Sequence, residues 1–180
     1  MAALRGLNLP PFFDAYGRDL APNAVLGRRP PELDSMKIYR PLLETREHGF
    51  AAVHLSLCEA GEGILLDDGV ILGVHPTLVE SIAIIQECAS LAGLRLYWTL
   101  LDAGSFVRCG ETFTRAIFSE PDTAARFAER VAGSITRRLD PNLTLAVEVV
   151  NEPEALIETG WDTLRAALST IADSIRAERP

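Results

Sequence analysis

Four apolar segments of the chain have the length and composition of buried β-strands. They cover residues 4–9, 50–57, 94–101 and 143–150. Short, nearly continuous apolar runs of this kind are typical of strands that are buried on both faces of a parallel sheet. The pattern therefore predicts four core strands.

After each of these runs, apolar positions recur at the three- and four-residue spacing of an amphipathic helix. This spacing predicts helices over residues 34–49, 76–91, 120–139 and 161–177. Asp34 or Ser35 is the expected cap of the first helix, and Pro41 within it predicts either a bend or a later start. Gly93 follows the second helix, where a glycine commonly ends one.

Two further segments stand outside this strand and helix pattern. Residues 10–33 are rich in Pro, Gly and Arg and predict a long loop. In "ILLDDGVILGV", Asp68 and Gly69 lie between two apolar arms, which is a strong signal for a β-hairpin. We expect this hairpin to be an excursion from the core.

The order strand, helix, repeated four times, predicts parallel strands joined by right-handed crossovers in a single domain over residues 1–180. Two architectures fit: a doubly wound open sheet and a (βα)8-type barrel. The first usually carries a glycine-rich turn after its first strand, and "NLPPFFDAYG" holds no such motif there. Polar residues instead follow several strand ends, which in a barrel form one face. They are Asn8, Asp14, Glu59, Asp102, Asn151 and Glu152.

Composition and charge limit the classes of partner. The 180 residues are 48% hydrophobic, which suits one soluble domain, and the net charge of -8 argues against a nucleic-acid partner. The three cysteines and three histidines show no disulfide or metal-binding spacing, so we predict no metal and no cofactor. Residues 1–13 lack the pattern of a secretion signal and no run is long enough to span a membrane, which predicts a cytoplasmic protein.

The segment "LTLAVEVVNEPE", residues 143–154, resembles the fourth strand of clan A glycoside hydrolases, the cellulase and mannanase type of (βα)8 barrel. The signature of that strand is Asn-Glu-Pro. "RGLNL" looks like the first strand of the family, "HGFAAVHLSL" like the second, and residues 67–102 like the segment that runs through the third. The resemblance implies that the chain is the N-terminal (βα)4 half of a TIM-type barrel.

The resemblance also implies a chemistry, the hydrolysis of O-glycosidic bonds in β-linked glycosides with retention of configuration. Glu152 then matches the general acid and base, and Asn151 matches the residue that hydrogen-bonds the 2-hydroxyl of the sugar. The alternative is that Asn151, Glu152 and Pro153 only end a strand. His54 stands where the family usually carries an arginine, and it is either a substrate-site residue or a satisfied residue of the core or rim.

The nucleophile of the family lies on strand seven, and the sequence ends after the fourth predicted helix. We therefore expect the N-terminal part of a longer protein, a homodimer of half-barrels, or a flatter fold. In a twofold dimer, Asp102 of the second copy would come close to the position of the nucleophile. The alternative for Asp102 is a cap of the turn "DAGS". A lone half-barrel is also expected to leave an apolar inner face and two unpaired strand edges.

Further candidates for binding a carbohydrate substrate are Asp14, past the first strand, and the aromatic residues Phe106 and Trp161, whose rings could stack on sugars. Trp98 is expected to pack between strand and helix. The leading hypothesis is a glycoside hydrolase. One alternative is a non-catalytic carbohydrate-binding or assembly protein on the same framework, and another is an unrelated α/β enzyme or partner-binding half-domain.

Overall fold

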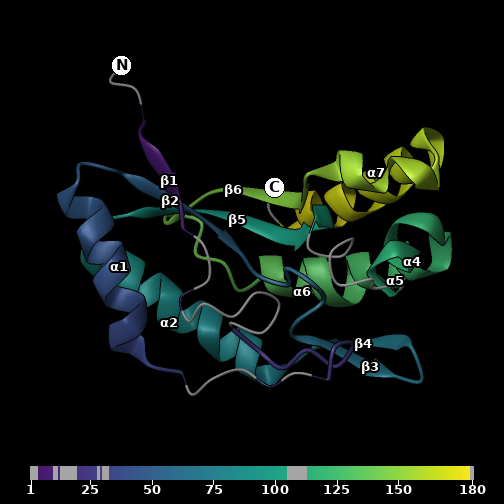
Figure 1. Cartoon of the computed structure of the whole chain (residues 1–180), viewed down its shortest axis with the longest axis horizontal. Coiled ribbons are helices and arrows are strands. Elements are labelled where there is room, and N and C mark those ends of the chain that lie inside the picture. The colour runs from purple at the N-terminus through teal and green to yellow at the C-terminus, as the bar shows by residue number, and fades with distance from the viewer. Residues whose placement is uncertain are drawn as a thin grey trace.

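The fold is described from a computed structural model, for residues 4–9, 12, 20–27, 29, 33–104 and 113–178, with the backbone alone for Thr114. Four strands form a parallel sheet in the order in which they occur along the chain (Figure 1). They are β1 (Gly6–Asn8), β2 (Ala52–Ser56), β5 (Arg95–Asp102) and β6 (Thr144–Asn151). The prediction of four parallel strands is therefore confirmed.

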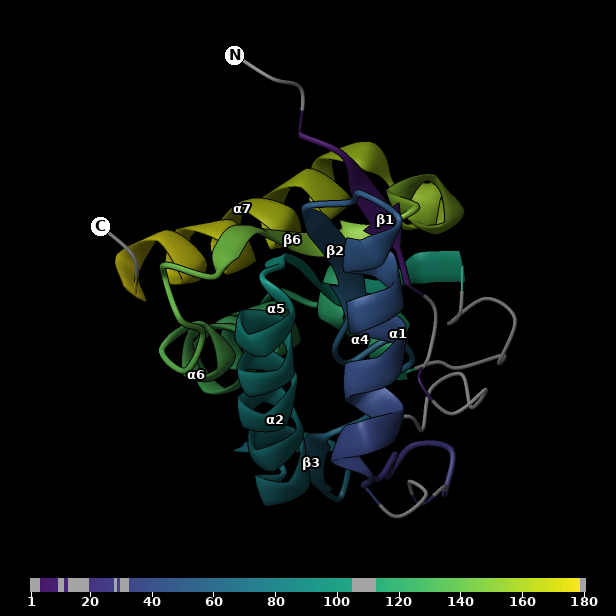
Figure 2. The same ribbon diagram turned by 90° about the vertical axis from the view of Figure 1, so that its left-hand side faces the viewer.

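Helices α1 (Ser35–Glu47) and α2 (Pro76–Ala92) lie side by side against one face of the sheet (Figure 2). Asp34 caps α1, because its Oδ1 accepts a hydrogen bond from the backbone N–H of Met36 at 2.9 Å. Pro41 lies inside α1 and does not delay its start. The left-handed Gly93, with a φ of 69°, ends α2 as predicted.

The helix predicted over 120–139 corresponds to a continuous helical run over residues 121–136, which includes a π-helical turn. A helix before it, α4 (Phe113–Ser119), was missed. Pro121 then begins a separate helical run, because proline has no N–H and pushes the preceding Glu120 into an extended conformation. This run consists of α5 (Pro121–Phe127), the π-helical turn η1 (Ala128–Ala132) and α6 (Gly133–Thr136).

The hairpin predicted around Asp68 and Gly69 is confirmed, and it forms a separate two-stranded sheet (Figure 1). Ile64 and Ile71 of the hairpin are buried in the core cluster, so the expectation that it is an excursion from the core is wrong. Strands β3 (Ile64–Asp67) and β4 (Val70–Val74) pair antiparallel. Asp68 and Gly69 both have positive φ angles, 46° and 75°, as a two-residue turn with left-handed central residues requires.

The core lies between the sheet and the helices. Val53 and Leu55 of β2 and Leu96, Trp98 and Leu100 of β5 alternate along their strands, so they share one face, and all are buried. They belong to one cluster with apolar side chains of α1 and α2, which include Ile38, Leu42, Leu78, Ile82 and Ile85. Trp98 thus packs between strand and helix, as predicted.

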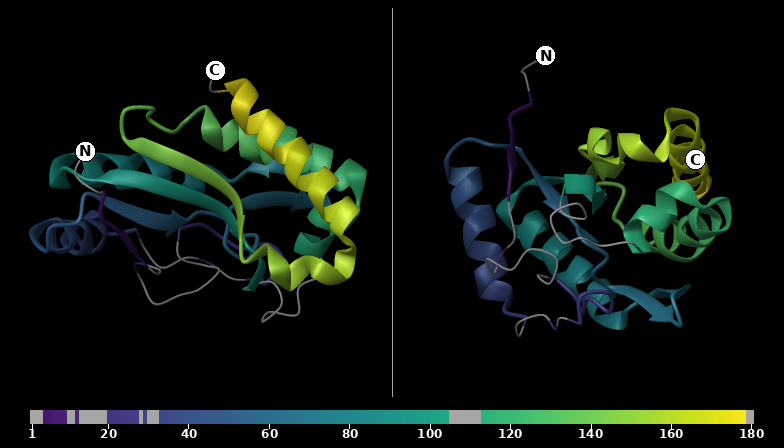
Figure 3. Two further views of the ribbon diagram at one scale, coloured as in Figure 1. Left: turned by 90° about the horizontal axis from the view of Figure 1, so that it is seen from above. Right: turned by 45° about the vertical axis from the view of Figure 1, so that its right-hand side comes forward.

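The opposite face of the sheet is polar at its centre. His54, Tyr97, Thr99 and Glu148 meet there across β2, β5 and β6. The expectation of an apolar inner face is therefore wrong for this part of the chain, because the residues that alternate with the core positions carry hydrogen-bonding groups. Helix α7 (Trp161–Glu178) runs beside the β6 edge of the sheet (Figure 3). None of the described helices is both long and apolar enough to span a membrane.

Candidate functional site

The carboxyl ends of the parallel strands bring several predicted residues to one edge of the sheet. Asn8, Asp102 and Asn151 are the last residues of β1, β5 and β6. Glu59 follows β2, and its backbone carbonyl accepts a hydrogen bond from the N–H of Asp102 at 3.0 Å. The prediction that polar residues gather at this edge rests on strand direction, and the observed register bears it out for these positions.

Asp102 and Asn151 are in direct contact at this edge. Their Cα atoms are register partners, and Nδ2 of Asn151 donates a hydrogen bond to Oδ2 of Asp102 at 2.8 Å. Asp102 is buried, with 9% of its surface exposed. The two residues therefore link the ends of β5 and β6 through their side chains.

Glu152 directly follows this pair and is exposed. Its φ of 51° and ψ of 49° are left-handed, which is uncommon for a residue with a Cβ and costs about 1–2 kcal/mol. The strain falls at the junction of β6 with the 3-10 helix η2 (Pro153–Thr159), where the N–H of Ala155 donates to the carbonyl of Glu152 at 3.0 Å. Backbone strain of this kind is concentrated at functional sites.

A second polar group occupies the inner face of the sheet. The hydroxyl of Thr99 donates to Oε2 of Glu148 at 2.6 Å, and Nε2 of His54 lies 2.5 Å from the same hydroxyl oxygen. Because threonine has a single hydroxyl proton and Glu148 accepts it, Nε2 of His54 must carry the proton of its own bond to Thr99. The distance from Nε2 of His54 to Oε2 of Glu148 is 3.6 Å.

The ionisation of this inner-face cluster follows from its partial burial. Burial lowers the pKa of His54, and the nearby carboxylates of Glu148 and Asp102 oppose that effect. Burial also raises the pKa of the Tyr97 phenol, with further contributions from the charge of Glu148 and a hydrogen bond to it. The imidazole of His54 and the phenol of Tyr97 are therefore both neutral at neutral pH.

Sequence reasoning identified His54 but missed its partners Tyr97, Thr99 and Glu148. The available signal was the two-residue alternation of each strand, which places these side chains opposite the apolar core positions. That signal does not show which residues of neighbouring strands are opposite one another. The register pairs His54 with Tyr97 and Thr99 with Glu148, and it is decided by the packing of the whole sheet.

The other predicted binding residues have separate positions. Trp161 is the first residue of α7 and is 60% exposed, so its ring is accessible from solvent. Asp14 and Phe106 lie outside the described residues. Within the part of the chain that the structure describes, no group of three or more His, Cys, Asp or Glu residues is arranged to hold a metal ion.

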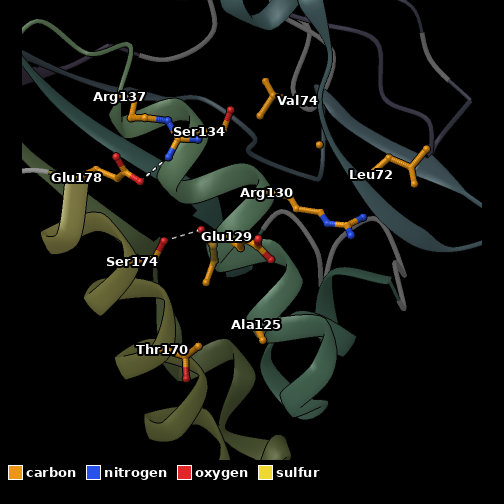
Figure 4. Close-up of a pocket in the computed structure, with 12 residues that line it drawn as sticks. Leu72, Val74, Ala125, Glu129, Arg130, Ser134, Arg137, Thr170, Ser174 and Glu178 are labelled. Atoms are coloured by element: carbon orange, nitrogen blue, oxygen red, sulfur yellow. Dashed lines mark hydrogen bonds and ion pairs between the residues drawn. The ribbon is translucent and has the colours of Figure 1, made fainter.

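A groove of about 670 Å³ lies elsewhere, between β4, the α5–η1–α6 run and α7 (Figure 4). Arg130 crosses to the hairpin, where its Nη1 donates to the carbonyl of Ile71 at 2.9 Å. An ion pair joins Arg137 to Glu178 at the other end of the groove. None of its lining residues belongs to the four-stranded sheet, so this groove is distinct from the strand-end site.

Comparison with solved structures identifies the fold. An exo-β-1,4-mannosidase from Opitutaceae bacterium strain TAV5 matches with a TM-score of 0.69 and 17% identity, over 97% of this chain and 30% of that one. A β-1,4-D-mannanase from Cryptopygus antarcticus matches with a TM-score of 0.68 and 15% identity, over 84% of this chain and 40% of that one. The chain has the fold of part of a clan A glycoside hydrolase barrel.

A third structure, GH5_18 from Streptomyces cattleya in complex with GlcNAc, matches with a TM-score of 0.63 and 18% identity. The match covers 83% of this chain and 38% of that one. The chain therefore spans about a third of the length of the glycoside hydrolases that it resembles. No protein-family model matches the sequence, and no curated protein matches it. The likeness confirms the predicted TIM-type half-barrel, and it concerns the fold alone.

Proposed function

We propose that this glycoside hydrolase-like chain supplies the acid and base part of a site that cleaves O-glycosidic bonds in β-linked glycosides. The observation that carries the proposal is the strained, exposed Glu152 at the carboxyl edge of the sheet, directly after Asn151. The similar structures include a protein named as a β-mannanase and one named as an exo-β-mannosidase, which supports β-1,4-linked mannosides as the substrate class.

Glycoside cleavage requires a proton for the leaving oxygen and a second group that stabilises or attacks the anomeric carbon. In the proposal, the exposed carboxyl of Glu152 gives and later removes that proton. Asn151 makes one described side-chain hydrogen bond, through Nδ2, and its Oδ1 is therefore available to accept a bond from a sugar hydroxyl.

A retaining mechanism also needs a nucleophilic carboxylate roughly 5 to 5.5 Å from the acid. The sequence suggested Asp102 of a second copy for this role. Asp102 is buried and holds Asn151 of its own chain, which favours a role within the chain over one in a second copy. The proposal therefore assigns only the acid and base role to this chain.

The test compares the purified chain with Glu152→Gln, using an aryl β-mannoside and β-1,4-linked mannotetraose as substrates. Azide is added as an external nucleophile, because the proposal assigns no nucleophilic carboxylate to this chain. We expect Glu152→Gln to lower kcat by about a hundredfold or more, as the loss of a general acid does, with little change in sugar binding. The control is Glu154→Gln, which removes another exposed carboxylate two residues away. Equal turnover by both variants would contradict the assignment.

The same experiment distinguishes the proposed catalytic function from a second candidate, carbohydrate binding without catalysis. His54 in place of the arginine of the resembled family favours this alternative. A wild-type chain that binds mannotetraose without cleaving it would support the non-catalytic function. A chain that neither binds nor cleaves the sugars would overturn both.

A further inference from the structure

We infer that Asp102 is a positioning residue, which holds the side-chain amide of Asn151 and through it the strained turn at Glu152. The inference rests on the proposed function for its consequence in catalysis. The contact itself is a property of the chain, so it is testable whether or not the chain cleaves a sugar.

The carboxylate of Asp102 is well placed to fix Asn151. The two residues end adjacent parallel strands and are register partners, and the bond from Nδ2 to Oδ2 measures 2.8 Å. A hydrogen bond to an ionised acceptor is shorter and stronger than one between neutral groups. It therefore joins the ends of β5 and β6 at the position where the backbone turns into Glu152.

Asp102 is itself fixed in place. Its backbone N–H is bound to the carbonyl of Glu59, and its neighbours Leu101 and Ala103 are completely buried. The residue as a whole is only 9% exposed. A group held in this way can orient a neighbouring side chain, whereas a nucleophile must be reached by the substrate.

The chemistry of the contact decides which end of the Asn151 amide is turned toward Asp102. A carboxylate only accepts hydrogen bonds, so the NH2 group of the amide must face it. Oδ1 is then on the side away from Asp102, as an acceptor. By orienting Asn151 in this way, Asp102 favours a ligand group that donates a hydrogen bond to Oδ1 of Asn151. A sugar hydroxyl is such a group, and it would be bound at the residue directly before Glu152.

The test uses two substitutions of Asp102 that differ in one property. Asp102→Asn removes the charge but keeps an oxygen that accepts from Asn151, whereas Asp102→Ala removes the acceptor. We expect Asp102→Ala to raise the KM or the Kd for mannotetraose by roughly tenfold or more. We expect Asp102→Asn to stay within about threefold of the wild type, with an unchanged pH profile.

A control and an activity-independent measurement complete the design. Asp140→Ala removes an aspartate before the amino end of β6, where it accepts from the N–H of Asn142 at 2.8 Å, and is expected to leave sugar affinity unchanged. The side-chain amide signals of Asn151, assigned in a ¹⁵N–¹H spectrum through Asn151→Asp, should shift in Asp102→Ala toward those of a free amide. They should shift less in Asp102→Asn.

The outcomes separate this inference from the proposed function. If Asp102→Asn and Asp102→Ala both lower kcat by about 10³-fold or more while the Asn151 signals stay in place, Asp102 acts chemically and the inference is overturned. Unchanged Asn151 signals in Asp102→Ala also overturn it. If the wild type neither binds nor cleaves, the proposed function fails, and the amide signals alone decide whether Asp102 holds Asn151.

Discussion

His54 is a residue of the inner face whose ionisation links the fold to pH. Burial lowers the pKa of its imidazole, against the opposing effect of the Glu148 and Asp102 carboxylates. The unfolded chain binds a proton at this residue near the ordinary pKa of about 6.5. Between that value and the lower pKa of the folded state, the unfolded chain binds more protons than the folded chain, so the free energy of unfolding falls as the pH falls. The contribution of neutral His54 is complete above this window and is lost as the pH falls through it.

We therefore predict that His54→Gln reduces the acid sensitivity of the fold. Glutamine keeps an N–H donor for the hydroxyl of Thr99 but takes up no proton. The free energy of unfolding, measured by urea denaturation between about pH 7.5 and 5.5, should fall less steeply with acidification than in the wild type. His48→Gln, at an exposed position near the end of α1, is the matched control and should follow the wild-type curve. Parallel curves for wild type and His54→Gln would contradict this role.

The residues of the candidate site were predictable to different degrees. Asn151 and Glu152 are marked by a local three-residue motif, which the sequence shows directly. The in-chain contact between Asp102 and Asn151 depends on the register of β5 and β6, which no local pattern contains. For the same reason, the sequence suggested a role for Asp102 in a second copy and missed its link to Asn151.

At the scale of elements, Gly63 connects three parts of the chain: the segment that contains Pro22, the start of the hairpin, and the start of α2. Its N–H donates to the carbonyl of Pro22 at 2.7 Å, and its own carbonyl accepts from His75, which caps α2, at 2.8 Å. A Cβ added to Gly63 would lie 2.6 Å from Cδ2 and 2.9 Å from Cβ of Leu78, and the φ of 70° disfavours a side chain in any case. The base of the hairpin and the start of α2 therefore require a glycine here.

We predict that Gly63→Ala destabilises the fold by about 2–5 kcal/mol, the sum of backbone strain and overpacking. Gly69→Ala, at the hairpin turn, is the matched control. Gly69 has a similar φ of 75° but no atom within 4 Å of an added Cβ, so only the strain of about 1–2 kcal/mol applies. Chemical denaturation of the two variants measures the difference. Equal losses would show that the contact with Leu78 is relieved without cost.

The elements themselves were largely predictable because their signals are local. The strands, the Asp34 cap, the left-handed Gly93 and the hairpin turn each follow from a few neighbouring residues. In the region from 113 to 139, the start of a helix near Pro121 was predictable from the sequence. The helix α4 before it was missed, because seven residues are too few to show a clear helical spacing of apolar positions.

At the scale of the whole molecule, the sheet has two edge strands. In the described part of the chain, β1 pairs only with β2 and β6 only with β5. Edge strands present backbone groups that can pair with another chain. The net charge of -8 opposes association between two copies, so the outcome depends on ionic strength.

We predict that the 19.6 kDa chain associates with itself, as the sequence suggested for a homodimer. The average mass from sedimentation velocity should rise toward that of a dimer over a roughly hundredfold concentration range. Added salt should favour the dimer, because it screens the repulsion between two acidic copies. A monomer at every concentration and salt level would exclude the homodimer.

The cytoplasmic location and the lack of a nucleic-acid partner also stay predictions.

The sequence by itself determined most elements of this protein and the motif at the end of β6. The signals for these features, which are apolar alternation, helix caps, turn residues and Asn-Glu-Pro, each involve only residues that are neighbours in the sequence. Only the tertiary structure decided which side chains meet. It tied Asn151 to Asp102 and His54 to Thr99 and Glu148. Contacts between strands depend on register, and register is decided when the faces of the whole sheet pack against the helices.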